Sequence, residues 1–269
     1  MPSLSVTSWN VEHFRGESRR LTRVVEVLQA GPTDVVALYE VEAEEAYDGL
    51  TSGLPGYQWH ITEGPQTQEI MVGVQGGLTA MFSQRLEFKS STSVLRPGAL
   101  VTVTKDGARF PLLFLHTKSL PDPRGFGIRT HQLEQAFALK KALDRKSRQL
   151  GDGPANFVFC GDLNSMGMDL SFSTFDIPAT EEIARLARAS AKRGMRLASK
   201  SHPATWYGAG TLPPSDLDQV VAAKHLVLSG TADAEVAVEG WPDEPTEAKR
   251  KRWIKNYSDH AVLRFEISA

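Results

Sequence analysis

The sequence predicts an α/β protein in which two β-sheets pack face to face and helices lie outside them. Strand-like and helix-like segments are interleaved along the 269 residues. The strand-like segments outnumber the helical ones, and the helical ones are scattered between them, which is the pattern expected for this architecture. No internal repeat, low-complexity tract or linker is evident in the sequence. We therefore expect a single domain that spans residues 1–269.

The first part of the chain predicts a strand, a helix and a second strand. LSVTSW at 4–9 alternates in polarity and stops at Asn10. The segment 17–30 predicts a helix, because its apolar residues recur at helical spacing: Leu21, Val24, Val25 and Leu28. Gly31-Pro32 ends this helix. DVVALYE at 34–40 is typical of a buried strand, and it runs into an acid.

The rest of the chain predicts mainly short strands and two helices. Short β-type segments are expected at 57–62, 69–75, 77–83, 86–95, 99–104 and 110–116, and KDG at 105–107 predicts a hairpin between the last two. An amphipathic helix is expected over 129–148 and another helical stretch around 180–194. The remaining strands are expected at 156–160, 216–223 and 261–268.

Composition excludes several classes of protein. The chain is 41% hydrophobic and 23% charged, with a formal net charge of −2, so overall charge favours neither nucleic acid nor an anionic membrane as partner. Cys160 is the only cysteine, so an intrachain disulfide is impossible. The first ten residues lack the basic and apolar regions of a signal peptide, and no apolar run approaches ~18 residues. We expect a cytoplasmic monomer with no membrane span, and no protein partner is evident.

Polar residues collect at the ends of the predicted strands. They are Asn10, Glu40, His116, Asp162, Asn164, Asp218, Asp259 and His260. Strand ends favour active sites because a rigid sheet aims several side chains into one crevice. Each residue taken singly also fits an ordinary role, such as a turn residue, a solvated acid or a histidine satisfied in the core. The set in this order is more specific than any member.

Six short motifs carry that set: SWNVE at 8–12, LYEV at 38–41, LHTKS at 115–119, GDLNS at 161–165, SDLDQV at 215–220 and SDH at 258–260. In order and spacing they resemble the endonuclease/exonuclease/phosphatase superfamily, which includes DNase I. The resemblance implies a four-layered α/β sandwich of two mainly antiparallel sheets with helices outside. It also implies a divalent-metal-dependent phosphoesterase.

Two departures from the superfamily pattern help to place the branch. The apurinic-site endonucleases have a tyrosine where this chain has His116, so LHTKS looks more like the DNase I, sphingomyelinase and inositol phosphatase side. Asp216 stands where many members carry an arginine, so the secondary contact that this arginine makes is in doubt here. The departure does not affect the match at Asp218.

The resemblance and the residue types together predict a metal site. We expect Glu40 to hold Mg²⁺ or Mn²⁺, with Asn10 and Asp259 completing or supporting the ligand set. Hard oxygen ligands and the absence of a Cys/His cluster favour these ions over zinc. The cation would offset the negative charge that an attacking oxyanion and a leaving alkoxide add to a phosphodiester.

The remaining site residues are expected to act on the phosphate. His260 should pair with Asp218, and it either takes a proton from water or neutralises a phosphate oxygen. Asp162 is the competing general base, and the sequence leaves this choice open. Asn164 would orient the phosphate, and His116 is a candidate donor to the phosphate or the leaving group.

Two segments are candidate substrate contacts. In KRKRWIK at 249–255, the residues Lys249, Arg250, Lys251 and Arg252 would contact a phosphate backbone, and Trp253 would stack on a base or wedge between bases. The alternative is a solvated helix end whose basic residues offset the acids of DEPTEAK. The glycine-rich segment SLPDPRGFGIR at 119–129 is expected to be a loop that clamps substrate through Arg124 or Arg129.

Three functions therefore remain open from the sequence. The first is a metal-dependent nuclease or phosphodiesterase, with DNA or RNA as the candidate substrate. The second is a phosphoesterase for inositol phosphates, phospholipids or other small phosphate esters. The third is a non-catalytic binding module on the same scaffold, which the full complement of polar site residues argues against.

Overall fold

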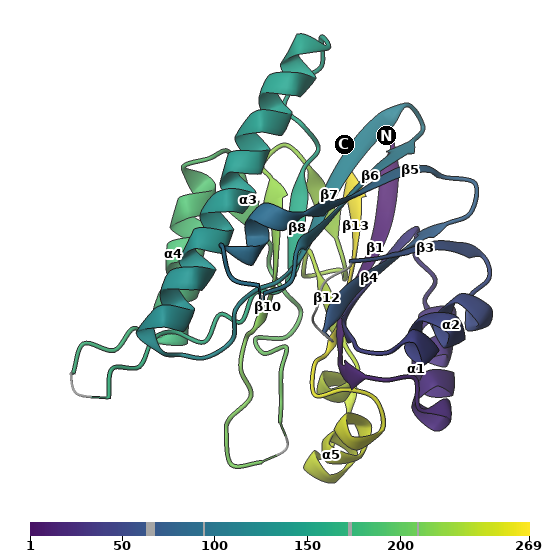
Figure 1. Cartoon of the computed structure of the whole chain (residues 1–269), viewed down its shortest axis with the longest axis vertical. Helices are drawn as coiled ribbons and strands as arrows, with labels where there is room; N and C mark the ends of the chain where they lie inside the picture. The colour runs from purple at the N-terminus through teal and green to yellow at the C-terminus, as the bar shows by residue number, and fades with distance from the viewer. Residues whose placement is uncertain (63–67, 94, 172–173, 209) are drawn as a thin grey trace.

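Two β-sheets form the centre of the computed structural model, which describes all residues except 63–67, 94, 172–173 and 209 (Figure 1). The first sheet has the order β11-β13-β1-β2-β4-β3, and β12 also pairs with β13. Its strands are β1 (Ser3–Phe14), β2 (Val35–Val41), β3 (Tyr57–Ile61), β4 (Glu69–Gln75), β11 (Val227–Ser229), β12 (Ala237–Glu239) and β13 (Val262–Ser268).

The second sheet has the order β5-β6-β7-β8-β10-β9. Its strands are β5 (Thr79–Arg85), β6 (Gly98–Lys105), β7 (Ala108–His116), β8 (Val158–Asp162), β9 (Met195–Leu197) and β10 (Asp218–Ala223). Among the described strands, the pairs β1–β2 and β7–β8 are parallel and the other pairs are antiparallel. The predicted pair of mainly antiparallel sheets is thereby confirmed.

Helices cover the outer face of each sheet. The helices α1 (Ser18–Ala30) and α2 (Glu44–Gly53) pack on the first sheet, where Val24 and Leu50 share an apolar cluster with Trp9. The helices α3 (Pro123–Gln149) and α4 (Ala179–Ala191) pack on the second sheet, where Phe137 and Leu186 join a separate cluster. The chain therefore forms four layers.

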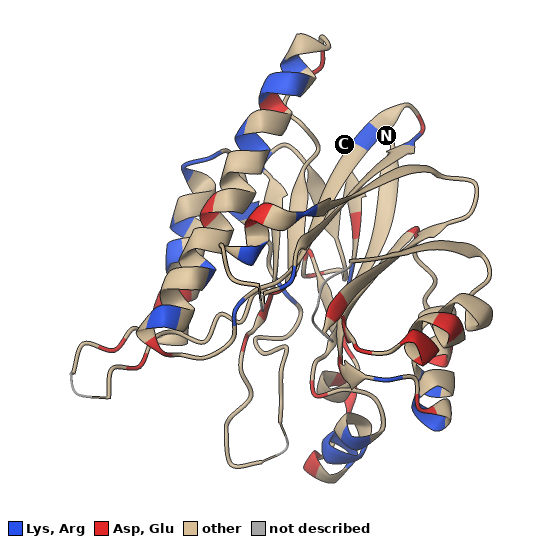
Figure 2. Ribbon diagram, in the orientation of Figure 1, with Lys and Arg blue, Asp and Glu red and all other residues tan. Residues whose placement is uncertain are grey.

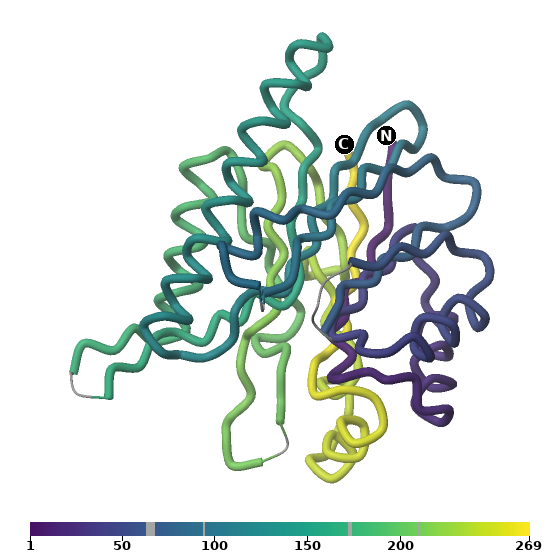
Figure 3. The backbone as a smooth tube through the Cα atoms, in the orientation of Figure 1, coloured from purple at the N-terminus to yellow at the C-terminus, as the bar shows by residue number. Residues whose placement is uncertain are grey.

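The main core lies between the two sheets, because the inward side chains of both sheets are apolar. It contains Val6 and Val35 from the first sheet and Val101, Phe114 and Val158 from the second, all of them buried. The single cysteine, Cys160, belongs to the same layer. Figure 3 shows the two ends of the chain side by side, in agreement with the antiparallel register that pairs Ser3 with Ser268.

Several elements differ from the sequence-based prediction. The helix α2 and the three-residue strands β9, β11 and β12 were not expected, because each is too short to show a clear period. The strand expected over 86–95 is wrong: residues 86–89 form the 3₁₀ helix η1 (Leu86–Lys89), and residue 94 lies outside the described residues.

The segment expected as a glycine-rich loop at 119–129 is also different. The helix α3 begins at Pro123, six residues before the predicted start at residue 129. Asp122 caps this helix by accepting a hydrogen bond from the Gly125 amide at 2.6 Å, and proline at the first helical position has no amide that needs a partner. The capping geometry thus offsets the weak helix propensity of the two following glycines.

The remaining elements lie near the C-terminus. They are the 3₁₀ helix η2 (Trp241–Asp243) and the helix α5 (Glu247–Asn256), which lies at the bottom of the view in Figure 1. Across the part of the chain that the structure describes, no helix has both the length and the apolar character needed to cross a membrane.

Gly161 gives a test of how the fold positions Asp162. Its φ is +135°, and a Cβ atom there would lie 2.1 Å from the Leu115 carbonyl oxygen and 2.7 Å from the Tyr39 hydroxyl. We predict that Gly161→Ala lowers the free energy of unfolding by about 2 kcal/mol or more, because backbone strain adds to the steric clash. Urea denaturation measures the change.

The matched control is Gly127→Ala in α3, where a Cβ atom would meet nothing within 4 Å. Helix propensity predicts that this variant is stabilised by up to about 1 kcal/mol. Equal stability of the two variants would contradict the importance of the close approach at Gly161.

Candidate active site

Three neighbouring strands of the second sheet bring three site residues into one row. The register pairs His116 at the end of β7 with Asp162 at the end of β8, and Asp162 with Asp218 at the start of β10. All three residues are buried, at 6%, 2% and 3% exposure. Residues in register on adjacent strands point to the same face, so the sheet aims these side chains together.

The first sheet adds Asn10 from β1 and Glu40 from β2. The Asn10 amide donates from Nδ2 to Glu40 Oε1 at 3.1 Å and to Asp162 Oδ2 at 3.0 Å. Glu40 adopts a left-handed backbone conformation with φ of 62°. Asn10 therefore connects the two sheets at the edge where their polar residues meet.

Asp162 lies at the centre of these contacts. Its Oδ1 accepts a hydrogen bond from the Asn164 amide at 3.0 Å, and its Oδ2 lies 3.5 Å from His116 Nε2 and 3.7 Å from His260 Nε2. Burial raises the pKa of the Asp162 carboxyl to about 7, although the neighbouring His260 acts in the opposite direction.

His260 pairs with Asp218, as the sequence predicted. The distance from His260 Nδ1 to Asp218 Oδ2 is 2.8 Å, and the Asp218 backbone amide donates to Thr205 Oγ1. Burial acts to lower the pKa of His260, but Asp218 and Asp162 outweigh it and raise that pKa to about 10. The ring therefore favours the imidazolium form between two carboxylates.

His116 has the opposite electrostatic character. Burial, together with the charge of Arg96, holds the pKa of His116 well below its usual range, so its imidazole is neutral near pH 7. Its Nε2 lies 3.6 Å from Glu40 Oε1, while Nδ1 has no hydrogen-bond partner among the described residues. One nitrogen thus faces the carboxylates of the site.

Asn164 lies beside this group in a left-handed conformation with φ of 47°. It is 5% exposed, and its Nδ2 donates to the Thr117 carbonyl at 3.2 Å. The same stretch is held to β7, because Thr117 N donates to the Asp162 carbonyl at 2.9 Å. The motif GDLNS therefore forms a fixed turn at the end of β8.

The carboxylate oxygens of the site fit a hard divalent cation. Glu40, His116 and Asp162 each offer a ligand atom, and these atoms lie within 4.8 Å of one another. Asp259 Oδ1 is a buried carboxylate oxygen with no hydrogen-bond partner in the described part of the chain. His260 Nε2 lies 3.9 Å from this oxygen, too far for a hydrogen bond, and a buried carboxylate oxygen without a hydrogen bond is stabilised by a bound cation.

The arrangement of the predicted metal ligands differs in part from expectation. Glu40 contacts Asn10 as predicted, and it also forms a group of potential ligands with His116 and Asp162, which were not expected to bind the metal. Asp259 Oδ2 accepts a hydrogen bond from Trp206 Nε1 at 2.7 Å, and Asp259 Oδ1 lies 3.9 Å from His260 Nε2.

Three residues near the site were not expected from the sequence. Trp206 fixes Asp259, and the Glu12 carboxylate accepts a hydrogen bond from the Asp259 amide at 3.3 Å. Arg96 lies just before β6; its charge acts on His116, and its Nε donates to the Gln68 carbonyl at 2.9 Å. SWNVE contained Glu12, but no motif pointed to Trp206 or Arg96.

The predicted substrate contacts are only partly at the surface. Arg129 is fully buried, with hydrogen bonds to Glu182 at 2.8 and 3.0 Å and to three backbone carbonyls. This position does not fit the substrate contact predicted for it, since the guanidinium is occupied inside the protein. Arg124 is exposed on the first turn of α3.

The basic segment forms the helix α5. Trp253 stacks on Tyr257 with ring centroids 4.9 Å apart and packs against Trp9, but its side chain stays partly exposed, so its contact with a base stays a prediction. The four basic residues before it, Lys249, Arg250, Lys251 and Arg252, lie on a helix at the lower end of the molecule (Figure 2).

Comparisons with known proteins agree with this geometry. A profile of the Endonuclease/Exonuclease/phosphatase family matches residues 7–260. A humanized form of TDP2 from D. rerio is 18% identical with a TM-score of 0.69, and each chain is covered to 99%.

Two further solved structures are also similar. A truncated TDP2 from Caenorhabditis elegans is 17% identical with a TM-score of 0.69, covering 99% of this chain and 98% of that one. The human Nocturnin catalytic domain is 16% identical with a TM-score of 0.64, covering 99% and 93%. Comparison of the sequence with curated proteins gave no match.

The structural role of Arg129 leads to a prediction. Arg129→Ala should lower the free energy of unfolding by about 3–5 kcal/mol, because it leaves the Glu182 carboxylate buried without its cation. Arg124→Ala, which changes an exposed arginine of the same helix, should change stability by no more than about 0.5 kcal/mol. Thermal and urea denaturation of both variants provide the comparison, and a neutral Arg129→Ala would contradict the buried pair.

Proposed function

The chain belongs to the Endonuclease/Exonuclease/phosphatase family, and on that premise we propose that it is a divalent-metal-dependent phosphodiesterase that cleaves nucleic acid. The observation that supports this most directly is the convergence on Asp162 Oδ2 of Asn10, His116 and His260, which come from both sheets. A phosphoester needs both a proton acceptor and positive charge at one place, and this cluster offers both.

Each group has a distinct role in the proposed reaction. Mg²⁺ or Mn²⁺, held by Glu40 with Asn10 and Asp259 nearby, would supply positive charge to the phosphate oxygens. Asp162 takes the proton from the attacking water, because its Oδ2 is an acceptor at the centre of the site. Asn164 and the neutral His116 orient the phosphate and the leaving group.

The geometry favours Asp162 over His260 as the general base. His260 Nδ1 is occupied by Asp218 at 2.8 Å, and its Nε2 lies between the carboxylates of Asp162 and Asp259. Carboxylates on three sides stabilise the imidazolium, which has no free lone pair with which to accept a proton. His260 therefore neutralises a phosphate oxygen as charge develops in the transition state.

Two observations favour nucleic acid as the substrate. One of the similar structures is D. rerio TDP2 complexed with a single-strand DNA product. In addition, α5 leads directly into the loop that carries Asp259 and His260, and it presents four basic residues. Lys251 is paired with Glu247 at 2.6 Å, while Lys249 and Arg252 form no ion pair within the described residues.

The second candidate is a phosphatase or phosphodiesterase of small esters, including inositol phosphates and phospholipids. It is favoured by the interior position of Arg129, which removes one of the contacts expected for a polymeric substrate. A panel of plasmid DNA, RNA, p-nitrophenyl phosphate, its bis ester and sphingomyelin, assayed with Mg²⁺, Mn²⁺ or EDTA, distinguishes the two candidates.

Asp162→Asn tests the catalytic assignment. The substitution keeps the size of the side chain and removes its basic oxygen, so kcat should fall by about 10²–10⁴-fold in a protein that thermal denaturation shows to be folded at the assay temperature. Arg145→Ala, at an exposed position of α3, is the control. Activity that survives both Asp162→Asn and exhaustive EDTA treatment would overturn the proposed mechanism.

The contribution of α5 is tested with the double variant Lys249→Gln/Arg252→Gln, which leaves the Lys251–Glu247 pair intact. We predict a higher KM for DNA and a salt dependence whose log–log slope is shallower by about 1–2, because each lost phosphate contact removes about one released counterion. Hydrolysis of bis-p-nitrophenyl phosphate should be unchanged, since a small diester does not reach α5.

The matched control is Lys141→Gln/Arg145→Gln, which removes the same charge from exposed positions toward the C-terminal end of α3. It should leave KM and the salt slope near their original values. Equal effects of the two double variants would mean that net charge matters and that α5 is not a contact surface. No cleavage of DNA together with rapid hydrolysis of small esters would favour the second candidate.

A further inference from the structure

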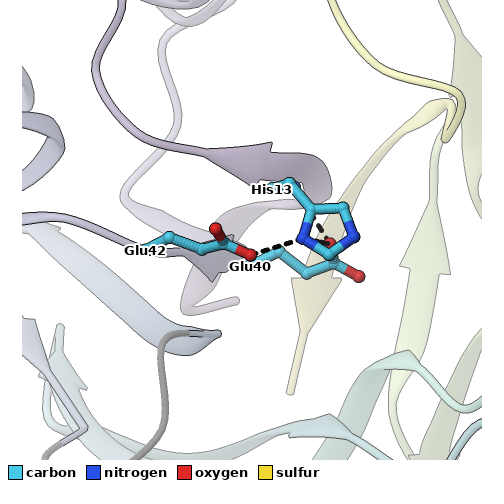
Figure 4. A group of neighbouring side chains, drawn as sticks. All are labelled: His13, Glu40 and Glu42. Carbon is cyan, nitrogen blue, oxygen red and sulfur yellow. Dashed lines mark hydrogen bonds and ion pairs between the residues drawn. The ribbon is translucent and has the colours of Figure 1, made fainter.

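A second cluster of ligand-type side chains lies next to the catalytic carboxylates. It consists of His13 near the end of β1, Glu40 near the end of β2 and Glu42 just after β2 (Figure 4). The three ligand atoms lie within 4.8 Å of one another. We propose that His13, Glu42 and Glu40 bind a second divalent transition-metal ion, such as Mn²⁺ or Zn²⁺, and that Glu40 bridges it to the catalytic cation.

The two oxygens of Glu40 face different groups. Oε1 accepts a hydrogen bond from Asn10 and lies 3.6 Å from His116 Nε2, on the catalytic side. Oε2 accepts a hydrogen bond from the His13 backbone amide at 2.9 Å and lies 3.7 Å from His13 Nδ1. A carboxylate whose oxygens serve two neighbouring centres is suited to bridging two cations.

The distances suit a single ion. Two ligands that each lie about 2.1 Å from the same ion are separated by about 3–4.2 Å in tetrahedral or octahedral geometry. The 3.7 Å between His13 Nδ1 and Glu40 Oε2 lies in this range. His13 Nδ1 and Glu42 Oε1 are in direct contact and must separate slightly to admit an ion between them.

The surroundings also resemble those of metal ligands. The Glu42 side chain is 3% exposed, and its second oxygen accepts a hydrogen bond from Arg15 Nε at 2.8 Å, which fixes the orientation of the carboxylate. The Gln68 side-chain amide lies 3.2 Å from His13 Nδ1, and rotation of that amide presents an oxygen as a fourth ligand. The His13 side chain is 60% exposed, so an ion can enter from solvent.

The ligand types identify the class of ion. An imidazole nitrogen with two carboxylates suits Mn²⁺, Co²⁺ or Zn²⁺, whereas Mg²⁺ prefers oxygen ligands and retains its waters. The site is independent of the substrate, and it rests on the proposed function only in that Glu40 also serves the catalytic cation.

The test is the number of ions that the full chain binds, measured by isothermal titration and by electron paramagnetic resonance with Mn²⁺ as the probe. We expect two Mn²⁺ ions in the wild type, with a spin-coupled signal, and one Mg²⁺ ion when Mg²⁺ replaces Mn²⁺. His13→Ala, which removes a largely exposed ring, should lose one Mn²⁺ and the coupled signal. Glu42→Gln should lower the affinity for the same Mn²⁺ ion by about 10–100-fold.

His131→Ala is the matched control, because His131 is an exposed histidine on α3. It should keep both ions. One ion in the wild type, or two ions retained in His13→Ala, would overturn the proposal and leave His13 and Glu42 as an ion pair only. Two bound ions in a protein without phosphoesterase activity would refute the proposed function and support the second metal site. One bound ion in a protein with full activity would support the proposed function and refute the second metal site.

Discussion

The hydrogen bond from Asn10 Nδ2 to Asp162 Oδ2 joins the two sheets at the place where their polar residues meet. Both residues are buried, at 0% and 2% exposure, so neither group has water as an alternative partner. An unpaired carboxylate at this depth would cost several kcal/mol. The relative position of the two sheets and the ionisation of the site are therefore linked through one contact.

The polar cluster is surrounded by structure that does not take part in chemistry. Thr205 holds the start of β10, Ser258 holds the backbone of Asn10, and Trp206 holds Asp259. These contacts fix side chains that carry charge in a region of low polarity, where a shift of about 1 Å changes the electrostatic energies strongly. The apolar core between the sheets supplies the rigidity that this arrangement needs.

Much of the fold could be predicted because local patterns match the final elements. The buried strand before Asp162 and the amphipathic pattern of α1 are visible in short windows of sequence. The helical start at Pro123 was missed because Gly125 and Gly127 favour a loop locally, and the Asp122 cap reverses that preference. Arg129 was misinterpreted because an arginine in a glycine-rich segment gives no sign of Glu182, its partner 53 residues later.

The sequence by itself determined which residue types end the strands, and with them the family. Strand periodicity and motif order are local properties, so they can be read without the fold. The tertiary structure decided which residues meet: the pairing of His260 with Asp218, the hydrogen bond from Arg96 to Gln68 and the contact of Trp253 with Trp9. These contacts join residues that are far apart in the chain, and only the packing of two sheets fixes their distances.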